Sequence, residues 1–361
     1  MSAMRAQMAK VDYPAILDAA WAQHLLPRRL DAPTVISLFA GCGGSSLGYS
    51  MAGYRELLAV EMNNRAVETF EANFPGVPVY HGDICELEAE ECLRLANLKP
   101  GELDVLDGSP PCQGFSTAGS RKIDDPRNLL PKEYVRLLRG LMPRAFIMEN
   151  VSGMVKGKMK LVFADIMREL KDSGYRVRCR LLNTMHYCVP QSRQRLIWIG
   201  TRNDLSAEPV YPETQQIISV GDALAGCTQL VPAPVERGQE IVLQHIPPGG
   251  GGAKEHVPEE LLKEYIPRMY GKTAYSYGGM CRRLSLTRPA WTINKTYAPY
   301  GQTPIHPAED RFVSIDEIRR LFSFPDGFVF TGTYTQIHSL LGNSVPPLFM
   351  RSIAEQVRTS I

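Results

Sequence analysis

The sequence lacks the features that mark secreted, metal-binding and membrane proteins. Its eight cysteines include no Cys-x-x-Cys pair and no close cluster with histidine, which argues against a zinc site and against a disulfide framework. Residues 1–11 contain no apolar core of a signal peptide, and no apolar run reaches the length of a membrane span. We therefore expect a cytoplasmic protein with reduced thiols, no bound metal and no membrane contact.

Two nucleotide-binding fingerprints are absent as well, and there is no internal repeat. The glycines at residues 41–44 follow neither the Gly-x-Gly-x-x-Gly spacing of nicotinamide enzymes nor the Gly-Lys-Ser/Thr ending of phosphate-binding loops. A nicotinamide oxidoreductase is therefore an alternative that lacks its expected loop.

A strong excess of charge is missing too, although the charge is unevenly distributed. The 361 residues have a net charge of only +2, yet residues 113–160 carry ten basic and four acidic side chains, and residues 174–203 carry six arginines and no acid. A polyanion such as nucleic acid is one partner for such surfaces. Solvated faces balanced by acidic helices elsewhere explain the same counts equally well.

The sequence does contain a series of short apolar runs that end in small or polar residues. Together with intervening helical patterns, these runs predict strands of an α/β protein with a doubly wound, mostly parallel sheet. The predicted strands are residues 35–39, 57–60, 77–81, 103–106, 145–148, 175–182 and 196–200.

Ligands of open α/β sheets bind at the carboxyl edge. There, five strand tips present the glycine loop, Glu61, Asp83, Cys112 and Glu149.

Each of these tips has an ordinary structural explanation beside the functional one. The glycines permit a tight turn as readily as the close approach of a ligand. Glu61 is placed to accept hydrogen bonds from ribose hydroxyls, but could equally stabilise the start of the next helix. Asp83 fits a turn as well as a ligand contact. Two prolines before Cys112 make its turn stiff; alone this would be a loop thiol, and beside the other tips it becomes a candidate nucleophile.

Basic side chains and a change of composition mark the second half. Arg193 and Arg195 lie two apart on a predicted strand, so both are expected to face one anionic or carbonyl-rich site. Residues 204–287 are rich in Pro and Gly, weakly periodic and slightly acidic, which predicts a separate, loop-rich domain. The polar loop at 117–131 is either a lid or a plain connection.

Six motifs occur in a fixed order: Phe-Ala-Gly-Cys-Gly-Gly at 39–44, Pro-Pro-Cys-Gln at 110–113, Glu-Asn-Val at 149–151, Gln-Ser-Arg-Gln-Arg at 191–195, Arg-Pro and Thr-Ile within 288–293, and Gly-Asn-Ser-Val-Pro-Pro at 342–347. Together they resemble the bacterial DNA cytosine-5 methyltransferase family over nearly the whole chain. Ser192 and Gln194 fill variable places, and residues 314–317 depart from the family's usual pattern at a structural helix.

The resemblance implies a Rossmann-like methyltransferase fold with a mixed seven-stranded sheet. It implies S-adenosylmethionine as methyl donor and cytosine in double-stranded DNA as acceptor. The domains would be a catalytic domain at 1–203, a small target-recognition domain with its hinge at 204–325, and a C-terminal return at 326–361. A companion restriction endonuclease, a monomeric state and association with the bacterial nucleoid are further expectations.

By position in the motifs, the resemblance implies that Cys112 is the nucleophile, Glu149 the acid, and Arg193 and Arg195 the partners of the base. The implied donor-site residues are Phe39, Ala40, Gly41, Gly43, Glu61, Met62, Asp83, Ile84, Gly108, Pro110, Leu130, Asn343 and Ser344. The expected DNA contacts are Gln113, Ser116, Arg121, Lys122 and Arg127.

These residue types suit the chemistry. A thiolate added at C6 makes C5 of cytosine nucleophilic, an acid at N3 and a cation at O2 stabilise the adduct, and the base must leave the stack to be reached. Two alternatives stay open: a methyltransferase of the same fold that acts on RNA, and an inactive DNA-binding relative.

Overall fold

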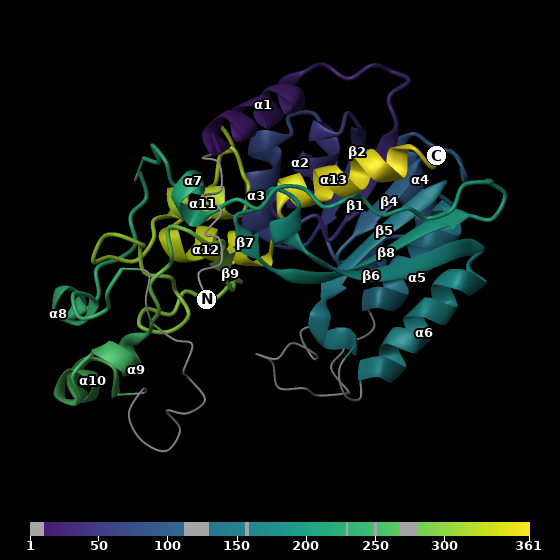
Figure 1. Ribbon diagram of the computed structural model, residues 1–361. Coiled ribbons are helices and arrows are strands. Elements are labelled where there is room, and N and C mark those ends of the chain that lie inside the picture. The colour runs from purple at the N-terminus through teal and green to yellow at the C-terminus, as the bar shows by residue number, and fades with distance from the viewer. Residues whose placement is uncertain (1–10, 112–129, 156–158, 229, 249–250, 268–280) are drawn as a thin grey trace, which may run out of the picture.

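A seven-stranded mixed sheet forms the centre of the molecule (Figure 1). The computed structural model describes residues 11–111, 130–155, 159–228, 230–248, 251–267 and 281–361. The strand order is β3-β2-β1-β4-β5-β8-β6, and the bounds are β1 Thr34–Leu38, β2 Arg55–Glu61, β3 Val79–His81, β4 Val105–Gly108, β5 Ala145–Val151, β6 Tyr175–Asn183 and β8 Gln194–Arg202. The mixed seven-stranded sheet implied by the resemblance is confirmed.

The first five strands run parallel, and β8 is antiparallel to both of its neighbours, β5 and β6. Strand β1 lies between β2 and β4, so the chain reverses its direction of travel across the sheet next to β1. At such a switch point the loops after adjacent strands diverge and leave a crevice at the carboxyl edge. The glycine loop after β1 and the proline turn after β4 lie on either side of that crevice.

Alternating side chains of the strands bury both faces of the sheet, as the short continuous apolar runs predict. Val35 and Ile147 belong to the core on one face, whereas Ile36 and Met148 belong to the core on the other. The first face is covered by α1 Tyr13–Leu25, α2 Gly44–Met51, α3 Asn64–Asn73 and α13 Pro347–Arg358. The second face is covered by α4 Ala89–Ala96, α5 Leu130–Leu141 and α6 Met159–Asp172.

The described residues of 204–346 form short elements beside the carboxyl edge of the sheet. They include the helices α7 Val220–Ala223, α8 Gln239–Leu243, α9 Ala253–His256, α10 Glu259–Tyr265, α11 Ile315–Leu321 and α12 Tyr334–Asn343. Strand β9 Ala290–Trp291 pairs in parallel with β7 Gln191–Ser192, which precedes this segment. Single turns of 3-10 helix are η1 Ile84–Glu86, η3 Ser152–Val155 and η4 Thr184–His186. A separate small core draws its buried residues from 242–312, while Tyr211, Ile218 and Val313 pack with the first face of the sheet.

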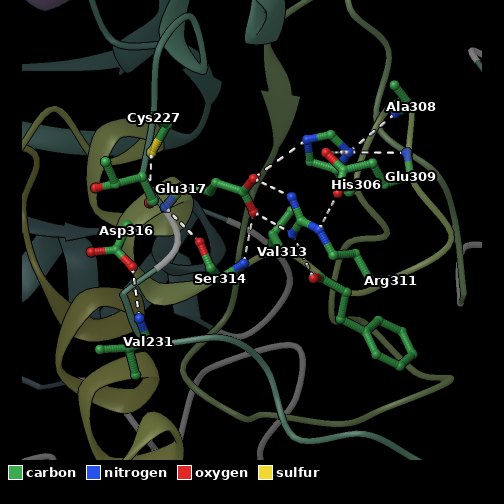
Figure 2. A network of polar contacts seen from close by, with 12 residues as sticks. Cys227, Val231, His306, Ala308, Glu309, Arg311, Val313, Ser314, Asp316 and Glu317 are labelled. Atoms are coloured by element: carbon green, nitrogen blue, oxygen red, sulfur yellow. Dashed lines mark hydrogen bonds and ion pairs between the residues drawn. The ribbon is translucent and has the colours of Figure 1, made fainter.

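A buried ionic network joins the small core to α11 (Figure 2). Glu317 accepts two hydrogen bonds from the guanidinium of Arg311, at 2.7 and 2.8 Å, and lies 3.3 Å from Nε2 of His306. Ser314 and Glu317 also form a reciprocal capping box at the start of α11, which accounts for the residue types at 314–317. Because Glu317 is only 2% exposed, the network fixes how the two cores meet.

Helix α1 begins at Tyr13, because the side chain of Asp12 accepts a hydrogen bond from the amide of Ala15 and so caps the helix. Among the described residues no helix is long and apolar enough to cross a membrane.

Candidate active site

A cavity of about 770 Å³ lies at the carboxyl edge of the sheet. Its walls come from the tips of β1, β2, β4 and β5, from η1, from α12 and from the segment that follows β9. Most of the predicted site residues that the structure describes therefore meet in one hollow, as the rule for strand tips requires.

The glycine loop after β1 forms one wall of the cavity. Phe39 and Gly41 both have φ of +56°, a left-handed backbone that is strained for the phenylalanine. At Gly41 a Cβ atom would meet no heavy atom within 4 Å, so the loop leaves open space beside its backbone. Gly43 does not line the cavity; the ring of Phe74 fills the place of its side chain, and Gly43 serves as N-cap of α2.

Glu61, at the tip of β2, holds three backbone amides. Its Oε2 accepts a hydrogen bond from the amide of Gly41 at 2.8 Å, and its Oε1 accepts from those of Met62 and Asn63 at 3.0 and 2.8 Å. The carboxylate thus ties the glycine loop to the start of α3, whose N-cap is Asn63. Glu61 therefore does stabilise the start of the following helix, which was the structural alternative for this residue. Its carboxylate also lines the cavity and keeps lone pairs that can accept hydrogen bonds from a ligand.

The remaining donor-site predictions divide between the cavity wall and the core. Asp83 caps η1 by accepting from the amide of Cys85 at 2.9 Å, and it also lines the cavity. Other predicted residues that line the cavity are Ala40, Met62, Ile84, Pro110, Leu130, Asn343 and Ser344. Gly108 does not, because it lies beneath the ring of Tyr134, which a Cβ atom would approach to 2.7 Å.

Glu149 and Arg195 form an ion pair at the other end of the cavity. The guanidinium Nε donates to Oε1 of Glu149 at 2.6 Å, and the two side chains are only 9% and 12% exposed. The antiparallel register of β5 and β8 sets Glu149 opposite Ile197, two residues from Arg195, so the pair is a diagonal contact on one face. The neighbouring Asn150 donates from Nδ2 to the carbonyl of Pro110 at 3.0 Å, which links β5 to the proline turn.

Arg193 lies between β7 and β8 and differs from Arg195 in its partners. Its guanidinium donates to the carbonyls of Ile293 at 3.2 Å and Gly342 at 2.8 Å, and the residue is 3% exposed. Burial, and then the charge of Arg195, lowers the pKa of Arg193. Both arginines line the cavity, but their guanidiniums bind different groups and do not face one common group as expected. Arg195 meets a carboxylate, while Arg193 joins distant segments of backbone.

The six arginines of residues 174–203 all make intramolecular contacts. Arg176 and Arg178 pair with Glu208, Arg202 pairs with Asp204, and Arg180 lies over the ring of Tyr211. With Arg193 and Arg195 engaged as above, this run is not a free basic surface.

Two buried acids, Glu56 on β2 and Asp107 on β4, lie just outside the apolar runs by which the sequence predicts these strands. Tyr49 Oη of α2 donates to Oδ1 of Asp107 at 3.2 Å, and both carboxyl oxygens of Glu56 are buried. Burial raises the pKa of Asp107 to about 7 and that of Glu56 to about 8.

Some lining residues are missed by sequence reasoning. Asn150 belongs to a recognised motif and could have been found there. The others come from weakly patterned segments that only the tertiary fold brings in: Asn294, Lys295, Thr296, Gln302, Gln336 and Ser339. The predicted nucleophile and DNA contacts, Cys112, Gln113, Ser116, Arg121, Lys122 and Arg127, lie outside the described residues.

Comparisons with known proteins agree with this geometry. Residues 33–359 match the family model of the C-5 cytosine-specific DNA methylases. The Type II methyltransferase M1.HphI of Haemophilus parahaemolyticus is 33% identical over 348 residues, covering 90% of this chain and 86% of that protein. The Type II methyltransferase M.PspPI of Psychrobacter sp. is 32% identical over 350 residues, covering 92% and 81%.

A solved structure shows the same fold. The DNA modification methyltransferase encoded within a prophage (E. coli) superimposes with a TM-score of 0.69 at 25% identity, covering 91% of this chain and 99% of that one. Family match, relatives and fold coincide over nearly the full length. The chain belongs to the C-5 cytosine-specific DNA methylase family, and it is a DNA cytosine-5 methyltransferase of a family that uses S-adenosylmethionine as methyl donor.

Proposed function

We propose that the cavity holds S-adenosylmethionine against a cytosine flipped out of duplex DNA, and that Cys112 forms a transient covalent bond to that base. The observation that supports this most directly is the common cavity: the glycine loop and Glu61 line one part, and the Glu149–Arg195 pair lines another. A donor and an acceptor must lie side by side for group transfer, and one hollow with two chemically different ends provides that arrangement.

The donor end fits a nucleoside with an amino-acid tail. Open space beside Gly41 allows a ligand to approach the backbone, and Glu61 offers carboxylate oxygens to ribose hydroxyls. Met62, Ile84 and Leu130 supply apolar surface for a purine ring. When bound, the donor supplies an electrophilic methyl group; the residues of this chain orient it and exclude water.

The acceptor end fits a cytosine ring. Addition of the Cys112 thiolate at C6 pushes electrons toward N3 and O2, so the base gains negative charge there. In its protonated form, Glu149 gives its proton to N3 and takes it back when the ring is restored, and Arg195, released from the ion pair, donates hydrogen bonds to O2. Arg193, bound to two carbonyls, positions Arg195 by fixing the start of β8. Loss of the C5 proton to a base or water, followed by release of the thiolate, restores the aromatic ring.

The partners follow from the same arrangement. We propose that residues 204–287 read the DNA sequence, and that Gln113, Ser116, Arg121, Lys122 and Arg127 contact the DNA. We also propose that the protein acts as a monomer at the nucleoid. A restriction endonuclease of the same specificity is proposed because relatives such as M1.HphI are named Type II methyltransferases.

The mechanism is tested with Cys112→Ser. Wild-type protein should transfer tritiated methyl groups to plasmid DNA, and the variant should transfer none, while both bind S-adenosylhomocysteine equally in calorimetry. A fully active variant would overturn the mechanism. Transfer to tRNA in place of DNA would instead indicate the RNA alternative. Exchange of residues 204–287 with those of a relative should change the methylated sequence, read by bisulfite sequencing, and leave the reaction intact.

A further inference from the structure

Among the described residues that line the cavity, four have cationic side chains, and three of these are engaged by the protein itself. Arg65 pairs with a glutamate on its own helix, Arg193 binds two backbone carbonyls, and Arg195 pairs with Glu149. Lys295 is the fourth. Within the part of the chain that the structure describes, its ammonium group has neither a hydrogen-bond acceptor nor an ion-pair partner. It is therefore the cation that is left to meet an anion of a substrate.

The backbone of Lys295 is held firmly against α12. Its carbonyl lies 3.4 Å from Nδ1 of His338, and a Cβ atom at Gly342 would overlap its Cα and amide nitrogen. Two residues earlier, the carbonyl of Ile293 is held by Arg193. Three contacts from distant parts of the sequence thus fix where the lysine side chain starts, and no described residue pairs with the ammonium group at its end.

The position of Lys295 distinguishes between the anions that the substrates carry. The side chains of Glu149 and Arg195 are about one-tenth exposed, so a base that reaches them enters deeply. Lys295 and its neighbour Thr296 are exposed and lie at the solvent side of the same cavity. When a base turns into a pocket, its phosphate stays outside on the strand. A lysine at the rim is a compact point charge suited to a phosphate oxygen.

We infer that Lys295 binds the backbone phosphate of the nucleotide whose cytosine is flipped into the cavity. The contact rests on the proposed flipping of the base, and it adds a residue that fixes the strand while the ring is held at the Glu149 end. Two other roles are outcomes of the test. Lys295 could bind the carboxylate of the methyl donor, or it could only stabilise the carboxyl end of α12 through the helix dipole.

The experiment compares Lys295→Met, which removes the charge, with Lys295→Arg, which keeps it. Lys99→Met is the matched control, because it removes one exposed lysine between α4 and β4, away from the cavity. Methyl transfer to plasmid DNA is measured at several KCl concentrations, with the KM values for DNA and for S-adenosylmethionine. Affinity for S-adenosylhomocysteine and the melting temperature are measured without DNA.

For Lys295→Met we expect the KM for DNA to rise about tenfold, the effect of one lost charge-assisted hydrogen bond. The slope of log KM for DNA against log salt should fall by about 0.9, as for one phosphate contact. Lys295→Arg should restore both values, and Lys99→Met should leave them unchanged. A rise confined to the KM for the donor, or a lower melting temperature with normal KM for DNA, would overturn the inference. Absence of any methyl transfer to DNA by the wild-type protein would instead remove the proposed function on which it rests.

Discussion

Replacement of the buried Glu56 by glutamine should stabilise the protein increasingly as the pH rises. Glu56 lies on β2 beneath the glycine loop, with both carboxyl oxygens buried. Burial raises its pKa from 4.5 to about 8. The folded protein therefore keeps this group protonated over a pH range in which the unfolded chain has already ionised it, and ionisation of the unfolded chain draws the equilibrium toward unfolding.

The sign and size follow from the two pKa values. A raised carboxyl pKa contributes its full stability below pH 4.5, and that stability is lost as the pH rises toward 8. At 1.36 kcal/mol for each pKa unit, the loss between pH 5.5 and pH 8 is about 3 kcal/mol. Glu56→Gln has the same shape and cannot ionise, so the variant should escape this loss.

The free energy of unfolding is measured by urea denaturation of wild type and variant at pH 5.5 and pH 8. The variant's advantage should grow by about 3 kcal/mol between the two pH values. Glu71→Gln, on the exposed side of α3, is the control and should show no such growth. An advantage for Glu56→Gln that is equal at both pH values would mean that Glu56 is ionised in the folded protein and would refute the reasoning.

Three further substitutions test how the site is held together. Arg193→Met removes both hydrogen bonds to backbone carbonyls and should cost about 3 kcal/mol of stability, measured by denaturation, while Arg193→Lys restores only part of it. Gly342→Ala forces a methyl group into the backbone of Lys295 and should lower stability by about 2–4 kcal/mol with a marked loss of methyl transfer. Glu317→Gln removes the more deeply buried of the two carboxylates that pair with Arg311, the other being Glu309, and should cost about 3 kcal/mol, which a melting curve will show.

Much of the donor side of the site can be predicted from the sequence because it depends on local rules. Short apolar runs define the strands, parallel strands place their tips at one edge, and the residues at those tips therefore meet. Glu61 and Asp83 are found in this way. The two buried acids, Glu56 and Asp107, cannot be predicted in this way. A strand pattern indicates which positions are buried, but it does not indicate that the core accepts a carboxyl group at one of them. Glu56 precedes the apolar run that marks β2, and Asp107 follows the one that marks β4.

The acceptor side depends on contacts that local patterns do not contain. The pairing of Glu149 with Arg195 requires the antiparallel register of β5 with β8, which is set by long-range packing. Lys295 lies in a stretch without periodicity, and it reaches the cavity only because Gly342 permits two backbones to touch. The family resemblance identifies Arg193 as a motif residue. Its hydrogen bonds to the carbonyls of Ile293 and Gly342, which join two distant segments, are seen only in the structure.

The closure of the fold bears on the proposal that residues 204–287 read the DNA sequence. Helix α13 packs directly on α2, and a Cβ atom at Gly48 would come within 2.7 Å of both the carbonyl of Pro347 and the Cβ of Met350. The C-terminal return is thus seated on the first helix after the glycine loop, and residues 204–287 form an excursion between two parts that already touch. Because the contact between α13 and α2 is made without residues 204–287, we expect an exchange of that segment to leave the geometry of the cavity unchanged.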